Sequence, residues 1–338
     1  MRKIFIGMSP GFYKKNLFSE LNKKMSVLVV YTTDYDKSSR NTDFMKGNMD
    51  FPYVELKGGK IQQSIQLLKI VLFEKYDELI VGGYDSLFCW VPVLFSSKKK
   101  NAAMIESTIR ETKMKGWRPM MKKMFFSRLA RAYVCGTPHA QLTKAFGFKG
   151  ENVFWHSVGL INTVPQPPFE ARQKVKKFLF VGRLIKEKNL AWLIERFSHH
   201  PELELDIIGF GSLERELKSK VVTPNIHFIG AVDNEKLSSY YRNSDVFILP
   251  SISETWGLVV EEALNNGTPV MLSHMVGCAD DLVLSDQAGV VFKLNDVDDF
   301  EKKLAQMKTL SVYNEKRRFI STLDFNARRQ MVINAFCK

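Results

Sequence analysis

Short apolar runs rich in β-branched residues alternate with helical patterns along this chain of 338 residues. Such alternation is typical of parallel sheets covered by helices on both faces, because buried parallel strands read as continuous apolar runs. In the first half, the pattern predicts strands at 3–8, 27–32, 78–81, 102–105, 133–135 and 153–155, and helices at 18–24, 61–73, 119–130 and 138–146.

A polar segment with three prolines interrupts this alternation. Pro165, Pro167 and Pro168 exclude regular structure, so we place a linker at 164–177. The second half predicts strands at 178–181, 205–208, 226–229, 246–249, 270–272 and 290–292, and helices at 190–197, 235–242, 297–307 and 326–336.

Two α/β domains are therefore expected. We assign 1–163 to the first domain, 178–320 to the second, and 321–338 to a terminal helical segment that can return to the first domain. Both domains are predicted to be Rossmann-like and to face each other across a ligand cleft at the carboxyl ends of their strands.

The apolar runs and the cysteines of the sequence indicate the compartment in which the protein is expected. No apolar run approaches the ~18 residues that a membrane span needs, and no signal-peptide pattern follows the N-terminus. Cys89, Cys135, Cys278 and Cys337 lie far apart and form no CxxC pair. We expect reduced thiols in a cytoplasmic protein.

The first half carries the whole positive charge. Residues 1–160 contain 26 Lys/Arg and 13 Asp/Glu, whereas 161–338 contain 23 of each. The segment 98–131 alone has a net charge of +9. Such a segment is expected to meet an anionic partner, such as a membrane surface, a polyphosphate lipid or nucleic acid.

Two glutamates mark the most informative stretch, PSISETWGLVVEEALNNGTP at 250–269. Glu254 lies in a polar loop after a predicted strand, and Glu262 lies eight residues on, inside a helix that opens at about Gly257. Two carboxylates can accept hydrogen bonds from the hydroxyls of a sugar or ribose. A loop that opens a helix offers backbone N–H groups to phosphate. Together they suggest a sugar nucleotide.

Basic residues follow the strand that opens the second domain. Gly182 allows close backbone approach, Arg183 can fork onto a diphosphate, and Lys188 adds a point charge. These charges would stabilise a leaving nucleoside diphosphate as the glycosidic bond breaks. A solvated basic turn is the plain alternative.

Glu254 and Glu262 form the E-x7-E signature, and the stretch resembles the retaining family-4 glycosyltransferases (glycosyl transferases group 1), which have the GT-B fold. The neighbouring residues agree, including Gly257, Gly267 and VGCADDLV at 276–283. The resemblance is strong over 178–292 and diffuse over the first half. It implies metal-independent transfer of a sugar from a nucleotide sugar, such as a UDP- or GDP-sugar, to a glycan or lipid-linked acceptor. The expected context is surface polysaccharide synthesis, such as capsule or lipopolysaccharide.

The resemblance also implies roles for individual residues. Glu262 would bind ribose, Glu254 would face the donor sugar or transition state, and Arg183 with Lys188 would bind the diphosphate. Backbone around Thr255, Gly257 and Leu258 would contact phosphate or sugar. Other implied contacts are Gly182 and Gly209 in the nucleotide pocket, Val232 near the base, Gly11 near the donor phosphate, and Trp256, for which packing is equally expected.

The acceptor side departs from the family. Many relatives have a His near the end of a strand of the first domain, but the matching segment, 102–111, contains none. Glu106 ends that predicted strand and is our candidate for orienting the acceptor hydroxyl. Pairing with Arg110 is the alternative.

No metal or other cofactor is expected. DxD patterns at Asp34–Asp36 and Asp296–Asp298 are of the kind that can hold a metal. We interpret both as structural, because the first lies in a polar loop after the second predicted strand and the second opens a helix, where acidic residues favour the dipole.

The basic segment 98–131 includes a candidate amphipathic helix. Met121, Phe125 and Leu129 fall on one face, with Lys122, Lys123 and Arg128 nearby. This helix can lie on an anionic membrane, which would make the protein peripheral at the inner face of the cytoplasmic membrane. Alternatively, its apolar face is buried in the first domain.

Two other functions stay open at this point. A GT-B epimerase or phosphorylase would share the nucleotide site. A nucleic-acid-binding or scaffold protein would explain the basic segment, but not the charged residues of the second domain.

Overall fold

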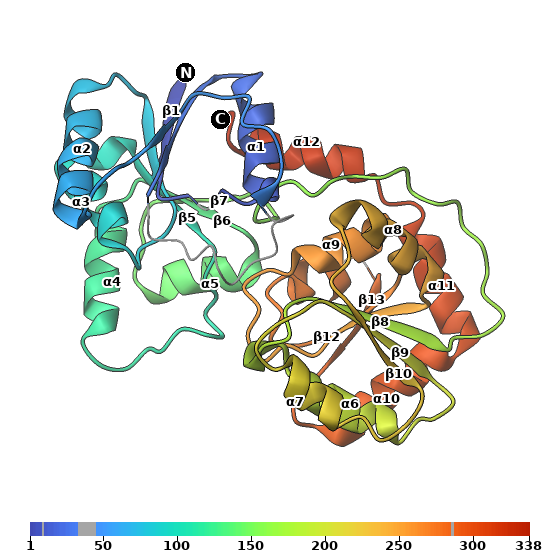
Figure 1. The fold of residues 1–338 in the computed structure, drawn as a ribbon. Helices are drawn as coiled ribbons and strands as arrows, with labels where there is room; N and C mark the ends of the chain where they lie inside the picture. Colours follow the sequence, from blue (N-terminus) through green and yellow to red (C-terminus); the bar gives the residue numbers. More distant parts are fainter. Residues whose placement is uncertain (9, 33–44, 285–286) are drawn as a thin grey trace. The chain divides into compact units, whose positions relative to one another are not determined.

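The computed structural model describes residues 1–8, 10–32, 45–284 and 287–338. The chain forms two compact units (Figure 1). Met1–Ile161 and Ala327–Lys338 make up the first unit, and Asn162–Asn326 the second. The end of the chain thus belongs to the first unit. The segment 164–177, which we predicted as a linker, belongs to the second.

The described part of the first unit contains a seven-stranded parallel sheet in the order β3-β2-β1-β4-β5-β6-β7. Its strands are β1 (Arg2–Ile6), β2 (Ser26–Tyr31), β3 (Tyr53–Glu55), β4 (Glu78–Val81), β5 (Asn101–Ile105), β6 (Arg131–Val134) and β7 (Glu151–Phe154). Its helices are α1 (Phe12–Asn22), α2 (Lys60–Phe73), α3 (Leu87–Phe95), α4 (Arg118–Ser127), α5 (Thr137–Ala145) and α12 (Phe325–Ala335).

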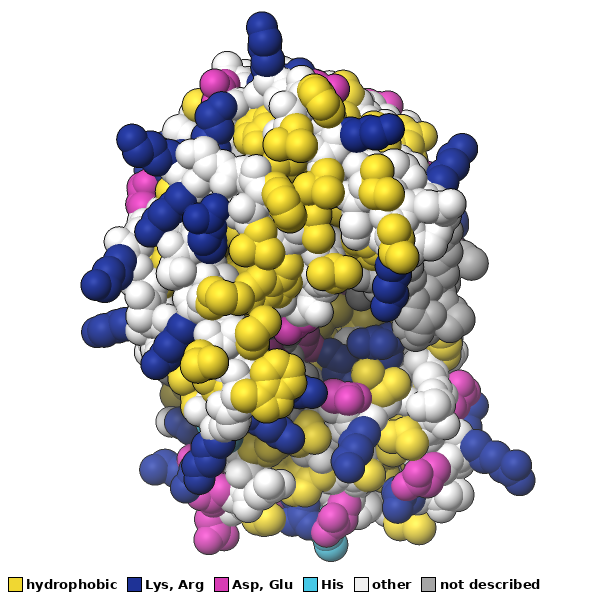
Figure 2. Space-filling model, turned by 90° about the vertical axis from the view of Figure 1, so that its left-hand side faces the viewer, with side chains coloured by type: hydrophobic (Ala, Val, Ile, Leu, Met, Phe, Trp, Pro, Cys, Tyr) yellow, Lys and Arg dark blue, Asp and Glu magenta, His cyan; other side chains and the backbone are white. Residues whose placement is uncertain are grey.

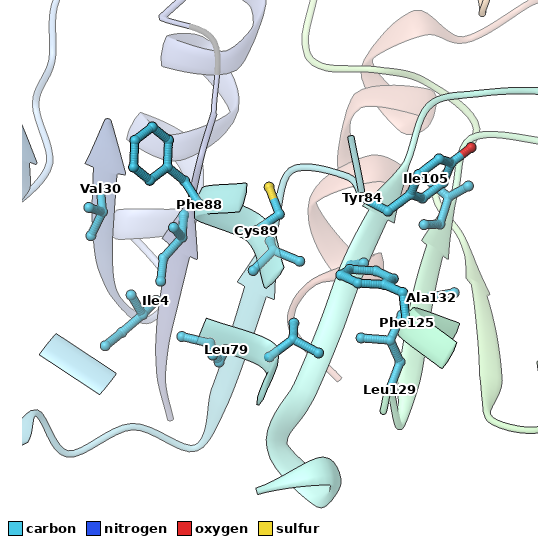
Figure 3. Close-up of a cluster of buried hydrophobic side chains, with 14 of the residues drawn as sticks. Ile4, Val30, Leu79, Tyr84, Phe88, Cys89, Ile105, Phe125, Leu129 and Ala132 are labelled. Carbon is cyan, nitrogen blue, oxygen red and sulfur yellow. The ribbon is translucent and has the colours of Figure 1, made fainter. Parts of the chain in front are cut away.

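Alternate residues of the central strands point to opposite faces of this sheet. Ile4 and Ile6 belong to a buried cluster that also contains residues of α2, α3, α4 and α5. Figure 3 shows part of this cluster, with Ile4 and Leu79 from the strands and Phe125 from α4. The sheet is therefore covered on this face by a continuous apolar layer.

The C-terminal helix and Phe336, which follows it, cover the other face, beside α1. The ring of Phe336 stacks on that of Tyr133 at a centroid distance of 4.5 Å and lies 6.0 Å from that of Phe5. Phe5 also packs against Phe18 of α1, at 4.9 Å. Figure 1 shows α1 and α12 on the side opposite α2, α3 and α4. The terminal residues therefore complete the core of the first unit.

The second unit repeats the architecture, with a described six-stranded parallel sheet in the order β10-β9-β8-β11-β12-β13. Its strands are β8 (Lys177–Val181), β9 (Glu204–Ile208), β10 (Ile226–Gly230), β11 (Val246–Leu249), β12 (Val270–Ser273) and β13 (Gly289–Phe292). Its helices are α6 (Leu190–Ser198), α7 (Glu214–Ser219), α8 (Asn234–Asn243), α9 (Leu258–Asn265), α10 (Val297–Lys308) and α11 (Leu310–Ile320). The prediction of two Rossmann-like α/β domains is confirmed.

Within the part of the chain that the structure describes, no helix combines the length and the apolar character that crossing a bilayer requires.

Candidate functional site

The strand order of the second sheet reverses between β8 and β11. The chain runs outward from β8 through β9 to β10 and then returns to β11 on the other side of β8. Parallel α/β sheets bind ligands at the carboxyl ends of the strands that flank such a switch point. Arg183 and Lys188 follow β8, and Glu254 follows β11. The fold thus brings the predicted charged residues to this point.

The carboxyl edge next to them is made of closely packed backbone. Gly209 N donates to the Gly230 carbonyl at 2.8 Å, and Gly182 N donates to the Ile208 carbonyl at 3.0 Å. A Cβ on Gly209 would lie 1.9 Å from the carbonyl oxygen of Gly182, and Gly209 has φ +134°. Only glycine fits there, so Gly182 and Gly209 leave the ends of β8 and β9 free of side-chain bulk.

A second segment fixes the loop that carries Glu254. Glu254 forms an isolated parallel bridge with Val276. Gly277 N donates to the Glu254 carbonyl at 2.9 Å, and Cys278 N donates to the Trp256 carbonyl at 3.0 Å. A Cβ on Gly277 would lie 1.8 Å from the Thr255 carbonyl oxygen. Gly277 therefore permits the close approach that holds the loop in place.

Lys188 and Glu254 form an ion pair across the switch point, with side chains only 14% and 16% exposed. Ile252 N also donates to the Glu187 carbonyl at 2.9 Å, which ties the two loops together. Arg183 is exposed and has no ion-pair partner among the described residues. The switch point thus has one cation fixed by a carboxylate and a second one available for an anion.

Helix α9 begins beside Glu254, with Gly257 as its N-cap. No side chain caps this end of the helix. The N-terminal N–H groups of a helix without a side-chain cap favour anions. The helix places Glu262 one turn further along, where the Tyr241 hydroxyl donates to its Oε2 at 3.0 Å.

Burial changes the titration of Glu262. Desolvation raises the pKa of Glu262 to about 7, and the neighbouring Glu261 adds to the rise, against the opposing hydrogen bond from Tyr241. Glu262 is partly buried as a residue. Near pH 7 Glu262 is thus about half protonated, and a hydroxyl ligand that donates a hydrogen bond to its carboxylate would favour the ionised form.

Comparisons with known proteins identify related sequences and folds. Residues 166–322 match the family of glycosyl transferases group 1. The second unit belongs to this family. Sulfoquinovosyl transferase SQD2 of Arabidopsis thaliana is 34% identical over 142 residues, 42% of this chain and 28% of that protein. The O-antigen biosynthesis glycosyltransferase WbnH of Escherichia coli is 34% identical over 149 residues, 41% of this chain and 43% of that protein. The matches thus span less than half of these curated relatives.

The fold of the whole chain resembles that of HepE from Anabaena, solved in complex with UDP and glucose. The TM-score is 0.72 at 12% identity, and the alignment covers 100% of this chain and 99% of that chain. At this identity the likeness establishes the fold alone, and it confirms the predicted GT-B class.

In the group 1 unit, the side chain of Trp256 is fully buried. Its indole Nε1 donates to Glu261, which is itself buried. The packing role that we kept open for Trp256 fits this position, while its carbonyl helps to hold the loop. Sequence analysis missed Glu261 and Tyr241. The double glutamate at 261–262 was the only signal for the first, and nothing in the sequence pointed to the second.

The first unit has its own group at the carboxyl ends of its strands. Gly11 is buried and precedes α1, and its carbonyl accepts from Lys15 N at 3.1 Å. Glu106 follows β5 and pairs with Lys14 rather than with Arg110. Lys14 is 2% exposed, and its Nζ lies 4.9 Å from the centroid of the Trp155 ring. Lys14, which sequence analysis missed, therefore holds Glu106 in place.

The other predicted residues lie after the end of β10, at the start of α10 or outside the described residues. Val232 follows β10, as expected, and is partly buried. Asp296 caps α10 by accepting from Asp299 N at 3.0 Å, which is a structural role. The other DxD pattern, Asp34–Asp36, lies outside the described residues. In the described ranges, no group of three or more His, Cys, Asp or Glu residues is arranged to hold a metal ion.

The pKa of Glu262 gives a testable dependence of stability on pH. Because the folded-state pKa, about 7, exceeds the ordinary value of 4.5, the folded protein binds this proton more tightly than the unfolded chain. Its contribution to stability is present below about pH 4.5 and is lost as pH rises to about 7. We expect Glu262→Gln to have a higher Tm than the parent above pH 7. Calorimetry across pH 4–8 measures this. Glu235→Gln, on the exposed side of α8, is the matched control, and parallel profiles for all three proteins would contradict the assignment.

Proposed function

We propose that this chain is a retaining, metal-independent glycosyltransferase. It transfers a sugar, with a hexose expected, from a nucleotide-sugar donor to a hydroxyl of a glycan or lipid-linked acceptor. The observation that carries this proposal is the charged group at the switch point of the group 1 unit, where Lys188 pairs with Glu254 beside the exposed Arg183.

The donor would lie along the carboxyl edge of the second sheet. Arg183, Lys188 and the N-terminus of α9 supply positive charge for the diphosphate. Glu262, held by Tyr241, supplies the acceptor oxygens for ribose hydroxyls. Glu254 would contact the donor sugar. Val276 and Gly277 fix its loop, so its carboxylate would be presented to the sugar in a constant position.

Chemistry at this site needs no protein nucleophile. The bond between the anomeric carbon and the diphosphate oxygen breaks, and a bond to the acceptor oxygen forms on the same face. The acceptor proton passes to the departing phosphate. Arg183 and Lys188 stabilise the charge that grows on that phosphate, so removal of either should slow turnover more than binding.

The acceptor side is assigned to the first unit. Glu106, held by the buried Lys14, would orient the acceptor hydroxyl by accepting its hydrogen bond. Because the matched relatives include an O-antigen glycosyltransferase and a sulfoquinovosyl transferase, we propose polysaccharide or glycolipid synthesis as the context. A cytoplasmic location is proposed, consistent with four free cysteines.

Nucleotide binding is the direct test. We expect one of UDP, GDP or ADP, or a corresponding nucleotide sugar, to raise the Tm by roughly 5 °C or more at 100 times its Kd, because binding then adds about 2.7 kcal/mol. Glu262→Ala should reduce this shift strongly. Arg183→Ala should reduce it little and lower kcat by about 10²-fold.

A control variant shows whether these effects belong to the donor site. Glu235→Ala should bind nucleotide as the parent does. If none of the nucleotides shifts the Tm, or if Glu262→Ala and Arg183→Ala behave as the parent, the proposed assignment of the donor site is wrong. Formation of an isomerised sugar nucleotide without added acceptor would favour the epimerase instead. NMR of the transferred sugar reads the anomeric outcome, and activity in EDTA tests metal independence.

A further inference from the structure

Three helices of the first unit expose apolar side chains on one continuous surface. Helices α3 and α4 are in contact through the rings of Trp90 and Phe125, whose centroids lie 5.1 Å apart. Helix α2 packs against α3. Their outward faces, with the loop before α4, form what we call the helical surface. Its most exposed apolar residues include Ile61 (79%), Phe73 (81%), Phe95 (58%), Trp117 (70%), Met120 (73%) and Met124 (46%).

Figure 2 shows this surface as a band of hydrophobic side chains with Lys and Arg along its borders. Helices α2, α3 and α4 contain five Lys/Arg residues and no Asp or Glu. Arg118, at the start of α4, and the adjoining Lys113 and Lys115 are exposed. Contiguous exposed apolar surfaces rimmed by polar residues commonly mark interaction sites, and the basic border restricts which partner can bind here.

The exposed apolar residues of α4 differ from those that the helical pattern in the sequence predicted for membrane contact. Phe125 and Leu129 are buried in the core of the first unit. The Nζ of Lys122 lies 4.4 Å from the centroid of the Tyr84 ring, and Arg128 donates to the Leu94 and Ser96 carbonyls at 3.3 Å. The face predicted for membrane contact is therefore largely internal. Met120, Met124 and Trp117 are exposed because α4 turns a second apolar face outward.

We propose that the helical surface docks the protein on an anionic lipid bilayer. Its apolar centre would enter the boundary between headgroups and acyl chains, as amphipathic interfacial helices do. Trp117 suits the interface, where its amphipathic ring is favoured. The basic border would bind anionic headgroups at about 1 kcal/mol per Lys or Arg. Helices on a folded sheet would then anchor the protein without crossing the bilayer.

Charge favours a bilayer over a second copy of this chain. A symmetric dimer formed through the helical surface would bring the basic borders of both copies together, and like charges across an interface cost binding energy. An anionic bilayer neutralises the same border. An anionic bilayer is therefore the partner that accounts for both the apolar centre and the basic border of the helical surface.

The helical surface is joined directly to the proposed acceptor residue. The segment after β5 begins at Glu106 and leads through the exposed Lys113–Trp117 stretch into α4. A lipid-linked acceptor would be held in the bilayer that this stretch contacts, which limits where its sugar can move. This point, unlike the docking itself, rests on the proposed glycosyltransferase function.

The test is co-sedimentation of the full chain with vesicles. We expect binding to vesicles that contain phosphatidylglycerol, weaker binding as salt rises, and little binding to phosphatidylcholine alone. The triple variant Lys113→Glu, Lys115→Glu, Arg118→Glu should weaken binding by about 10²-fold. Trp117→Ser, Met120→Ser, Met124→Ser should weaken it by roughly tenfold. All six positions are exposed, so both variants should keep the parent's Tm.

Matched substitutions in the second unit serve as controls. Lys302→Glu and Val222→Ser replace exposed residues there and should bind vesicles as the parent does. The vesicle assay needs no donor, and nucleotide-induced Tm shifts should be equal in all variants, so failure of docking and failure of the donor site are distinguishable. Absence of parent binding to phosphatidylglycerol vesicles overturns the proposal. So does a concentration-dependent dimer that the Ser variant abolishes while vesicle binding persists.

Discussion

Replacement of Lys188 by alanine should lower kcat by about 10²- to 10³-fold, with a smaller effect on donor binding. Lys188 lies at the reversal of strand order, and its Nζ is positioned by Glu254 in a site where both side chains are mostly buried. A cation fixed in this way stabilises the leaving diphosphate without reorganising, which is why loss of one such group has an effect of this size. Steady-state and single-turnover kinetics with the nucleotide sugar identified by Tm screening measure it.

The ion pair offers a sharper version of this experiment. Lys188→Ala also leaves Glu254 without its partner, and an unpaired, partly buried carboxylate repels a diphosphate. If Lys188 only neutralised Glu254, the double variant Lys188→Ala, Glu254→Gln would be as active as Glu254→Gln alone. We expect the double variant to be slower than Glu254→Gln alone. Lys186→Ala, an exposed lysine two residues away, should be as active as the parent.

Much of the fold could be predicted because burial leaves a direct pattern in the sequence. Strand β4 was predicted at the observed residues and β11 likewise, since both are short apolar runs with all residues buried. Strand β3 was missed because it is an edge strand with exposed residues and so shows no apolar run. Helix α3 was missed because it contains Pro92, which ordinarily ends a helix.

For the candidate site, positions were easier to predict from the sequence than contacts. Arg183, Lys188 and Glu254 could be expected at the ends of β8 and β11 because charged side chains after strand ends are visible in sequence, while their roles and that of Glu262, inside α9, stay predictions. The ion pair between Lys188 and Glu254 was not foreseen, since it depends on β8 and β11 being neighbours. The pairing of Lys14 with Glu106 likewise joins elements far apart in the chain. Sequence spacing suggested Arg110 only because it is near.

Gly209→Ala should destabilise the protein by about 3 kcal/mol or more, because two penalties act together. The new Cβ would lie 1.9 Å from the carbonyl oxygen of Gly182, and φ is +134°, where side chains other than glycine are strained by ~1–3 kcal/mol. Relief of the clash requires β8 and β9 to separate at their carboxyl ends, at a cost of ~1–3 kcal/mol for overpacking. A fall in Tm of about 10 °C is expected, together with weaker nucleotide binding.

Gly83→Ala separates the two penalties. Gly83 has φ +128°, nearly the same as Gly209, but a Cβ there would meet nothing within 4 Å. This variant should therefore show the backbone strain alone and bind nucleotide as the parent does. Chemical denaturation of both variants gives the difference in free energy of unfolding. Equal losses in the two would mean that the contact between Gly209 and Gly182 imposes no constraint of its own. A larger loss at Gly209, with reduced nucleotide affinity, would show that the donor site depends on bare backbone at the ends of β8 and β9.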